Sequence, residues 1–233
     1  MNPIIKEINR VLKALTGKMD GYYLAGGTAL SLFYFQHRES YDLDFFSKEF
    51  SKKRIEDIVK NLSADIDKKL SLIGEETKKD RAQVLVYSYK VNEDTLKIDF
   101  VEDAYKLIKS PKIINGIPAL EKEDIYLRKI FAACGSYAVI NEIGNKEFKG
   151  GRQEAKDFFD LYFLSKTFMP LSKFAVEYCD PVQIESIVVW YRTYDRIGIK
   201  LGLLDIITDK KVDFQEMERH FRSEIDQMIE KGL

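Results

Sequence analysis

The chain has few cysteines, few histidines and no excess of positive charge, and each shortage excludes a class of protein. Among its 233 residues the two cysteines, Cys134 and Cys179, lie far apart in apolar segments, which predicts reduced thiols in a cytoplasmic protein. The two histidines, His37 and His220, have no companion at metal-ligand spacing, which argues against a zinc site. With 37 basic and 38 acidic residues, any nucleic acid must be bound by a local group of residues rather than by overall charge.

Long hydrophobic runs are also absent. No segment approaches the roughly 20 apolar residues that span a membrane, and the N-terminal stretch lacks the apolar core of a signal peptide. We therefore expect no membrane partner. A hydrophobic content of 45% and a charged content of 32% are typical of a soluble globular protein, and the length allows one large domain or two small ones.

The most informative stretch begins with a predicted buried strand at residues 22–25, followed by Gly26 and Gly27. Paired glycines let the backbone turn tightly and approach a ligand closely, because no Cβ intervenes. Thr28 is predicted to cap a helix at residues 29–36, so that backbone N–H groups and the positive end of the helix dipole face the turn. This junction is either an ordinary turn or a cradle for phosphate.

Two aspartates follow in the string D-L-D-F-F. In an extended strand Asp42 and Asp44 share one face, while Leu43 and Phe45 pack on the other. Neighbouring carboxylates repel unless a proton or cation lies between them, and hard oxygen ligands suit Mg²⁺. The pattern therefore predicts either a solvated strand edge or a metal site. Just before it, Arg38 is a candidate phosphate ligand, because its guanidinium can bind phosphate in a bidentate manner.

A third acidic position lies in a predicted hairpin at residues 83–101. Alternation places Lys97 and Asp99 on one face of its second strand, with apolar residues on the other. An aspartate in apolar surroundings is costly unless it meets a cation. That cation is either Lys97 or Arg81 in a structural salt bridge, or a bound metal ion.

The remaining sequence is mostly helical. Residues 110–120 contain two prolines and a glycine and predict the crossing between two domains, 1–115 and 116–233. The expected fold class is α+β, with the strands in the first domain and a helical bundle in the second. Apolar residues at helical spacing predict helices at 3–18, 51–73, 121–134, 152–164, 171–179, 181–201 and 213–231.

Charged residues occur on two of these helices where burial is expected. Lys129 is flanked by small apolar residues and is either buried or a surface lysine that extends to solvent. In the helix at 152–164, apolar residues cover nearly the whole circumference, so Asp157 and Asp160 need partners. Lys156, one turn from Asp160, is one candidate, and a purely structural ion-pair network is an alternative to a functional site.

Two further clusters have a structural and a functional interpretation. Lys48 and the basic residues 52–54 follow the aspartate pair and form either a solvated helix end or a surface for a polyanion. The aromatic residues Trp190, Tyr191 and Tyr194 form either part of a core or a surface that stacks bases. The connection at 135–151 contains four glycines and is predicted to be a flap or an inserted element.

Taken in order, these motifs resemble the nucleotidyltransferase superfamily. The string G-G-T-A-L, then Arg38, Ser40 and D-L-D-F-F, is similar to its AbiEii-type toxin branch. K-x-D at Lys97 and Asp99 resembles the second motif of that branch. The segment around Lys129 and K-D-x-x-D-L-Y resemble two later motifs. The resemblance implies a mixed β-sheet with flanking helices, followed by a helical domain that completes the site.

The resemblance also implies a role for each residue. Gly26, Gly27 and Thr28 would hold the triphosphate of an NTP, with Arg38, Lys97 and Lys129 as further nucleotide ligands. Asp42, Asp44 and Asp99 would bind two Mg²⁺ ions, or Mn²⁺ in their place, and Asp99 would be the general base. Lys129, Asp157 and Asp160 would support catalysis. The implied biology is a toxin of a toxin–antitoxin (phage-defence) system, with an antitoxin partner and tRNA as acceptor.

Three other functions fit the same sequence. The acceptor could be a protein or a small molecule rather than tRNA. The chain could be a non-catalytic, antitoxin-binding protein with a vestigial site, which would not bind NTP in a Mg²⁺-dependent manner. A metal-dependent phosphodiesterase would release products from nucleic acid without consuming NTP.

Overall fold

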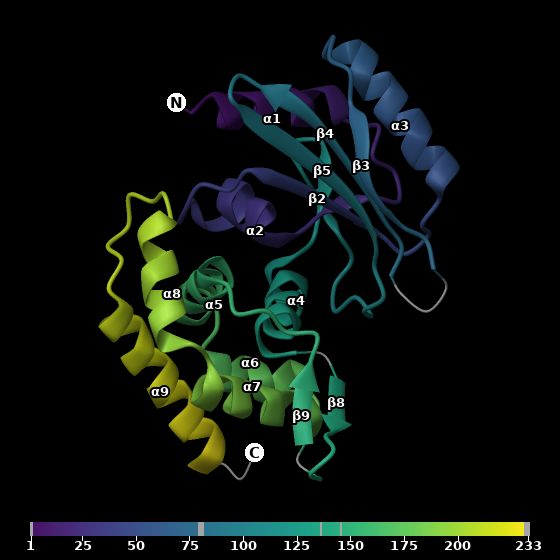
Figure 1. Cartoon of the computed structure of the whole chain (residues 1–233). Helices are drawn as coiled ribbons and strands as arrows, with labels where there is room; N and C mark the ends of the chain where they lie inside the picture. The colour runs from purple at the N-terminus through teal and green to yellow at the C-terminus, as the bar shows by residue number, and fades with distance from the viewer. Residues whose placement is uncertain (1, 79–81, 136, 145, 231–233) are drawn as a thin grey trace. The chain divides into compact units, whose positions relative to one another are not determined.

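The computed structural model describes residues 2–78, 82–135, 137–144 and 146–230 (Figure 1). The chain divides into two compact units, Met1–Glu121 and Lys122–Leu233. Within the described residues no helix is both long and apolar enough to cross a membrane. The architecture is mixed α and β, with the large sheet in the first unit and a helical region in the second, as the sequence predicts.

The first unit is built on a seven-stranded mixed sheet with the strand order β3-β4-β5-β2-β1-β7-β6. Strands β2 and β5 are parallel, as are β1 and β7, and the other neighbours are antiparallel. Its elements are α1 (Pro3–Leu15), β1 (Tyr23–Leu24), α2 (Gly26–Ala29), the π-helix η1 (Leu30–Phe35), β2 (Asp42–Ser47), α3 (Lys52–Asp65), β3 (Ser71–Glu76), β4 (Val84–Val91), β5 (Asp94–Glu102), β6 (Lys112–Ile114) and β7 (Ile117–Ala119).

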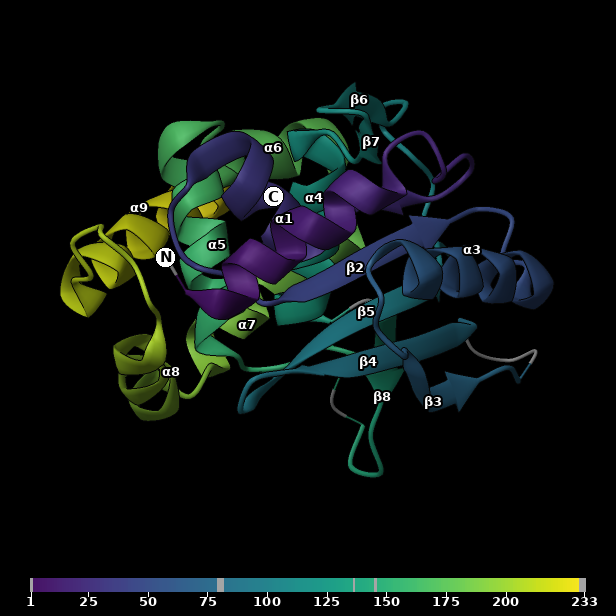
Figure 2. The ribbon, with the colours of Figure 1, turned by 90° about the horizontal axis from the view of Figure 1, so that it is seen from above.

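Helices α1 and α3 lie over one face of this sheet (Figure 2). Helix α1 begins where the Asn2 side chain accepts a hydrogen bond from the Ile4 N–H, and Pro3 occupies its first turn, where a missing N–H costs nothing. Its apolar stripe, which includes Ile8 and Val11, is fully buried against α3, β4 and β5. The predicted helix at 3–18 is therefore confirmed, and it ends before Gly17.

The hairpin of β4 and β5 is also confirmed, and it fixes the register of the site. Its turn contains Asn92 with a φ of 56°, a left-handed conformation that asparagine tolerates. Alternation along β5 buries Ile98 and Phe100 completely and leaves Lys97 and Asp99 on the opposite face.

Two strand segments differ from the sequence prediction. The helix expected at 51–73 ends at Asp65, because Asp67 turns the chain with a φ of 47°, and the edge strand β3 follows. Residues 112–119, expected in the crossing between domains, form the hairpin of β6 and β7. Because β7 pairs with β1, this hairpin belongs to the first unit, and the boundary falls after Glu121 rather than after residue 115.

The second unit is helical, with one two-stranded hairpin. Its elements are α4 (Lys122–Cys134), β8 (Tyr137–Ile140), β9 (Lys146–Lys149), α5 (Ala155–Thr167), α6 (Leu171–Tyr178), α7 (Pro181–Thr193), α8 (Arg196–Gly202), the 3₁₀ turn η2 (Leu203–Asp205) and α9 (Phe214–Glu230). The predicted inserted element at 135–151 corresponds to the β8–β9 hairpin. The predicted helix at 181–201 is two helices, because the Asp195 side chain accepts hydrogen bonds from two N–H groups and starts α8.

Aromatic side chains form the core of this unit. The Trp190 ring stacks on Tyr194 at 5.6 Å between centroids and meets the Phe221 ring edge-on at 5.5 Å. Trp190, Tyr191 and Tyr194 are all buried. The cluster around Trp190 is therefore a packing element that joins α7 to α9, and its structural interpretation is favoured over base stacking.

Candidate active site

The glycine turn joins β1 directly to α2. Gly26 has a φ of 67°, and a Cβ built on it would lie 2.7 Å from Oδ2 of Asp44. Only glycine combines this left-handed backbone with so close an approach to a side chain. The Ala25 N–H donates to the main-chain oxygen of Asp44 at 2.9 Å, so the turn and the aspartate strand are held together. Gly27 is buried in the same turn.

Thr28 has a different role from the predicted helix cap. The helix begins at Gly26 without a side-chain cap, and Thr28 lies inside it. Its hydroxyl donates to the main-chain oxygen of Asp42 and lies 2.8 Å from the Ser40 hydroxyl. Thr28 therefore fastens the glycine turn to the segment that carries the aspartates, while the first N–H groups of the helix remain without intrahelical acceptors.

The three predicted metal ligands are brought together by the parallel pairing of β2 and β5. Asp44 is the register partner of Asp99, and Asp42 is the register partner of Lys97. Neighbouring strands lie about 4.8 Å apart, and paired residues project from the same face of the sheet. On the opposite face Leu43 and Phe45 are fully buried. The predicted juxtaposition of Asp99 with the D-x-D pair is therefore present, with Lys97 beside it.

Asp99 lies in an unfavourable environment for a lone carboxylate. Burial, together with the charges of Asp44 and Asp42, raises its pKa to about 7, and Lys97 only partly opposes this. Its Oδ1 atom is buried, and no residue in the described part of the chain donates a hydrogen bond to it. Of the two structural salt bridges considered from the sequence, the one to Lys97 is not formed within the described residues, and Arg81 lies outside them.

This environment fits a divalent cation. Within the described ranges no three His, Cys, Asp or Glu side chains are already gathered around a single point at ligand distance. Magnesium sites, however, commonly use one or two carboxylates, with substrate phosphates and waters as the other ligands. The buried oxygen of Asp99, next to Asp44, is an acceptor that a cation would satisfy, and it would relieve the repulsion that raises the pKa of Asp99.

The raised pKa of Asp99 predicts the pH dependence of stability in metal-free protein. Between about pH 4 and pH 7 the folded state retains a proton that the unfolded state has lost, so the free energy of unfolding falls as the pH rises. Since Asp99 is partly exposed, we expect a loss of about 1–2 kcal/mol across this window. Urea unfolding in EDTA should show it, and Asp99→Asn should remove it. An identical pH profile in the variant would contradict the assignment.

Other candidate cations of the first unit are held by neighbouring groups. Arg38 is buried, its guanidinium donates to the main-chain oxygen of Glu39 at 3.0 Å, and its own main-chain oxygen accepts from the Ser31 hydroxyl. A role in phosphate binding thus stays a prediction for Arg38. Ser31, which was not predicted, positions this loop from η1. No sequence motif distinguishes it from other helical serines.

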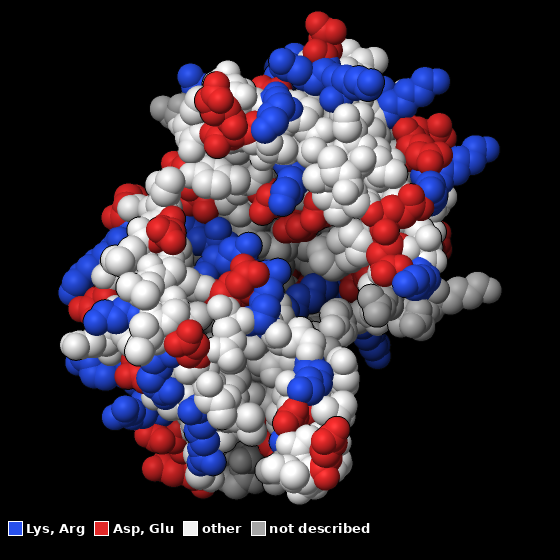
Figure 3. Space-filling view, viewed as in Figure 1, with Lys and Arg blue, Asp and Glu red and all other residues white. Residues whose placement is uncertain are grey.

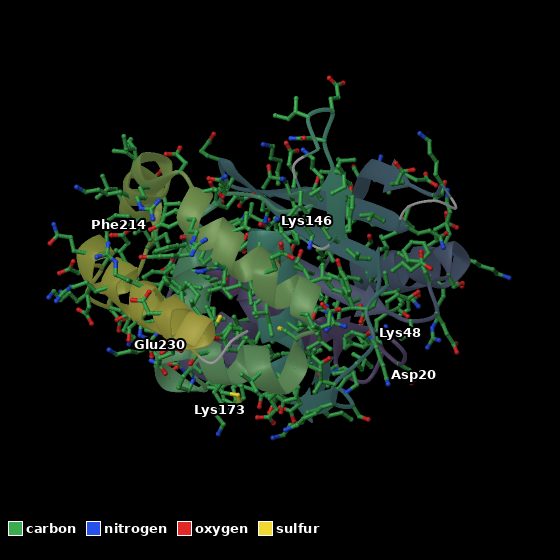
Figure 4. All side chains as sticks on the ribbon, turned by 90° about the horizontal axis from the view of Figure 1, so that it is seen from below. Asp20, Lys48, Lys146, Lys173, Phe214 and Glu230 are labelled. Carbon is green, nitrogen blue, oxygen red and sulfur yellow. The ribbon has the colours of Figure 1, made fainter. Side chains whose placement is uncertain are left out.

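The basic cluster after β2 is engaged in ion pairs. Lys48 lies 3.8 Å from the carboxylate of Asp103, and Lys52 lies 2.5 Å from that of Glu75. Arg54 lies 3.3 Å from Asp20. Asp20 and Lys48 are both labelled in Figure 4. On the face in Figure 3, basic and acidic side chains are interspersed. These contacts favour the solvated helix end over a surface for a polyanion.

In the second unit Lys129 lies between the two predicted aspartates. Its Nζ is 2.7 Å from Asp157 Oδ1 and 2.7 Å from Asp160 Oδ2, and all three side chains are buried. Lys156, one of the candidate partners for Asp160, lies 3.0 Å from Glu154 instead, and the amino group beside Asp160 comes from Lys129 of α4. Sequence spacing along one helix could not indicate a partner from another helix.

A second cation joins this cluster. Arg152 lies 2.6 Å from Asp157 Oδ2 through Nε and 3.3 Å from Oδ1 through Nη2. Burial would raise the pKa of Asp157, but Lys129 and Arg152 outweigh it and the pKa is lowered. Arg152 was not among the predicted site residues, because an arginine five positions before an aspartate is not a recognisable motif.

Comparison with known proteins assigns this chain to a family. Residues 10–231 match the family described as "Nucleotidyl transferase AbiEii toxin, Type IV TA system". The chain belongs to this family. The resemblance noted from the glycine and aspartate motifs is thereby confirmed, and the match extends through the C-terminal helices. None of the curated proteins is similar enough to match.

Two crystal structures from Helicobacter pylori share the fold of this AbiEii-family chain. JHP933 is 18% identical with a TM-score of 0.60, and the similarity covers 98% of this chain and 93% of that one. A protein described as a candidate nucleotidyltransferase is 19% identical with a TM-score of 0.61, over 98% of this chain and 94% of the other. At this identity the likeness establishes the fold alone.

Proposed function

We propose that this AbiEii-family protein transfers a nucleoside monophosphate from an NTP to an acceptor hydroxyl and releases pyrophosphate. The observation that supports this best is the pairing of Asp44 with Asp99 beside the Gly26 turn. A turn of backbone N–H groups next to acidic oxygens can hold a triphosphate and its counter-ion together.

In the proposed reaction each group of the first unit has a distinct task. The N–H groups of Gly26, Gly27 and Thr28 bind the β- and γ-phosphates, and Lys97 neutralises phosphate charge. Asp99 accepts the proton of the acceptor hydroxyl as the general base. The acceptor oxygen then forms a bond to the α-phosphorus, and the bond from that phosphorus to the bridging oxygen breaks.

Asp42, Asp44 and Asp99 are the residues that would hold Mg²⁺, with Mn²⁺ as an alternative. A divalent cation held there supplies charge neutralisation for the attacking and leaving oxygens of an in-line displacement. The second unit contributes Lys129, Asp157 and Asp160 to the proposal. Because two carboxylates share the amino group of Lys129, its main effect is to hold both of them in place.

The biological role follows the family. We propose a cytoplasmic toxin with a cognate antitoxin and with tRNA as the acceptor. Incubating the protein with each labelled NTP and with tRNA, lysate protein or small acceptors tests the reaction and identifies the acceptor. We expect label to enter tRNA in a Mg²⁺-dependent manner. Label in protein or in a small molecule would show that the acceptor is not tRNA. Release of nucleic-acid fragments without consumption of NTP would show that the reaction is phosphodiester cleavage and not nucleotidyl transfer.

Substitution of Gly26 tests the role of the turn. In Gly26→Ala the new Cβ would force Asp44 to move, and the left-handed backbone would be strained. We expect transfer to fall by about 100-fold, since small displacements of reacting groups are costly. Gly17→Ala is the matched control, because Gly17 has a φ of 71° but no atom within 4 Å of the new Cβ. Equal activities of the two variants would exclude the turn from the site.

A further inference from the structure

The outer face of α8 and of the η2 turn that follows it carries a stripe of exposed apolar side chains. Ile197, Leu201 and Leu204 are 73%, 59% and 81% exposed. Residues four and three positions apart lie on the same face of a helix, so these three side chains form one row along it. Figures 1 and 2 show α8 at the edge of the second unit. Large apolar side chains grouped on a surface in this way indicate an interaction site.

The opposite face of this segment is packed into the second unit. Ile199 and Leu203 are buried. A Cβ built on Gly202 would lie 2.8 Å from the Cβ of Ala155 on α5, so the two helices are in close contact there. A side-chain cap also holds the start of α8. The stripe is therefore preformed, and a partner that binds it needs to order little further chain.

A charge of each sign flanks the stripe. Lys200 directly precedes Leu201, and Asp205 directly follows Leu204. Both charged side chains are exposed, and within the described residues neither forms an ion pair. If Leu201 takes the a position of a heptad, Ile197 and Leu204 take d positions. Lys200 then takes the g position and Asp205 the e position, which are the positions where paired helices exchange salt bridges.

This order of charges fits a second copy of the chain in one orientation. When two identical helices pair in parallel, each g residue faces the following e residue of the other helix. Lys200 of each copy then meets Asp205 of the other, and two-fold symmetry makes this contact twice. An antiparallel pair would instead place the two copies of Lys200 near one another, which is unfavourable.

We propose that α8 and η2 form a self-association surface, on which a second copy of this chain docks with its own α8 parallel to the first. The exposed parts of the three apolar side chains amount to roughly 200 Å² per copy, well below the ~800 Å² per partner of a standard stable interface. The association is therefore weak, with a dissociation constant on the order of 10–100 µM. This inference does not depend on the proposed function.

Sedimentation equilibrium of the full chain from about 1 to 200 µM tests the surface. We expect the average mass to rise with concentration from the mass of one chain towards twice that mass. Leu204→Asp should weaken the association at least about tenfold, because it places an unpaired charge in the interface. Ile113→Asp is the matched control, because Ile113 is 71% exposed on β6 of the first unit. It should associate like wild type.

Exchange of the two charges tests the parallel arrangement. Lys200→Glu and Asp205→Lys should each weaken association severalfold, because like charges then meet, and the double variant should recover it. Four results would overturn the inference: a wild type that stays monomeric at every concentration, unchanged association in Leu204→Asp, an equal loss in Ile113→Asp, or no recovery in the double variant. If circular dichroism shows Leu204→Asp to be unfolded, the charge-exchange variants decide in its place.

Discussion

Asp99→Ala is expected to reduce nucleotidyl transfer by at least about 1,000-fold in kcat/KM while leaving the protein folded. The substitution removes both the proposed base and an oxygen ligand for the cation, and losses of this size are typical when an essential group of a unit is removed. Folding should be retained, because Asp99 makes no hydrogen bond through Oδ1 and its raised pKa shows that its charge destabilises the folded state.

Asp44→Ala should have a similar effect, since its carboxylate faces the same point from the neighbouring strand. Asp94→Ala is the control, because Asp94 is an exposed residue of the same strand as Asp99 and should change the rate by less than about threefold. Steady-state rates with labelled NTP provide the measurement. Full activity of Asp99→Ala or of Asp44→Ala would contradict the proposed mechanism.

Lys129→Met is expected to lower the free energy of unfolding by about 3–5 kcal/mol. The change leaves Asp160 and part of Asp157 buried without their cation, and uncompensated buried charge is among the most costly defects. Urea unfolding measures the loss. In Lys156→Met, which removes an exposed pair, the change should stay within about 0.5 kcal/mol.

A second substitution separates lost charge from lost packing. In Lys129→Met combined with Asp160→Leu, one unpaired charge is gone and Asp157 retains Arg152, so much of the stability should return. A loss below about 1 kcal/mol in Lys129→Met alone would mean that the cluster is not the buried ion network described above. No recovery in the double variant would assign the loss to packing.

The sequence was most informative where chemistry and local geometry coincide. The period-2 alternation of β2 and β5 placed Asp42, Asp44 and Asp99 on the strand faces opposite the apolar residues, and the family motifs suggested that the two strands meet. Gly26 was identifiable because a left-handed turn against a side chain demands glycine. These predictions depend on positions near in sequence or on a known motif order.

Features that depend on contacts between distant parts of the chain could not be predicted from the sequence. The apolar residues at 66–73 continue a helical spacing, but pairing with β4 makes Ser71–Glu76 a strand. The hydroxyl of Thr28 could accept a hydrogen bond from a helix N–H group as a cap, yet in the fold it donates to the main-chain oxygen of Asp42. The partner of Asp160 comes from α4, and Arg152 joins the cluster only because the β8–β9 hairpin returns the chain to the end of that helix.

Calorimetric titration of each NTP into the full chain, with Mg²⁺ and again with EDTA, tests most directly whether the aspartates and the glycine turn form one nucleotide site. We expect at least one NTP to bind with Mg²⁺, and we expect this binding to be lost in EDTA and in Asp44→Ala. Equal affinity in EDTA, or in Asp44→Ala with Mg²⁺ present, would contradict this expectation.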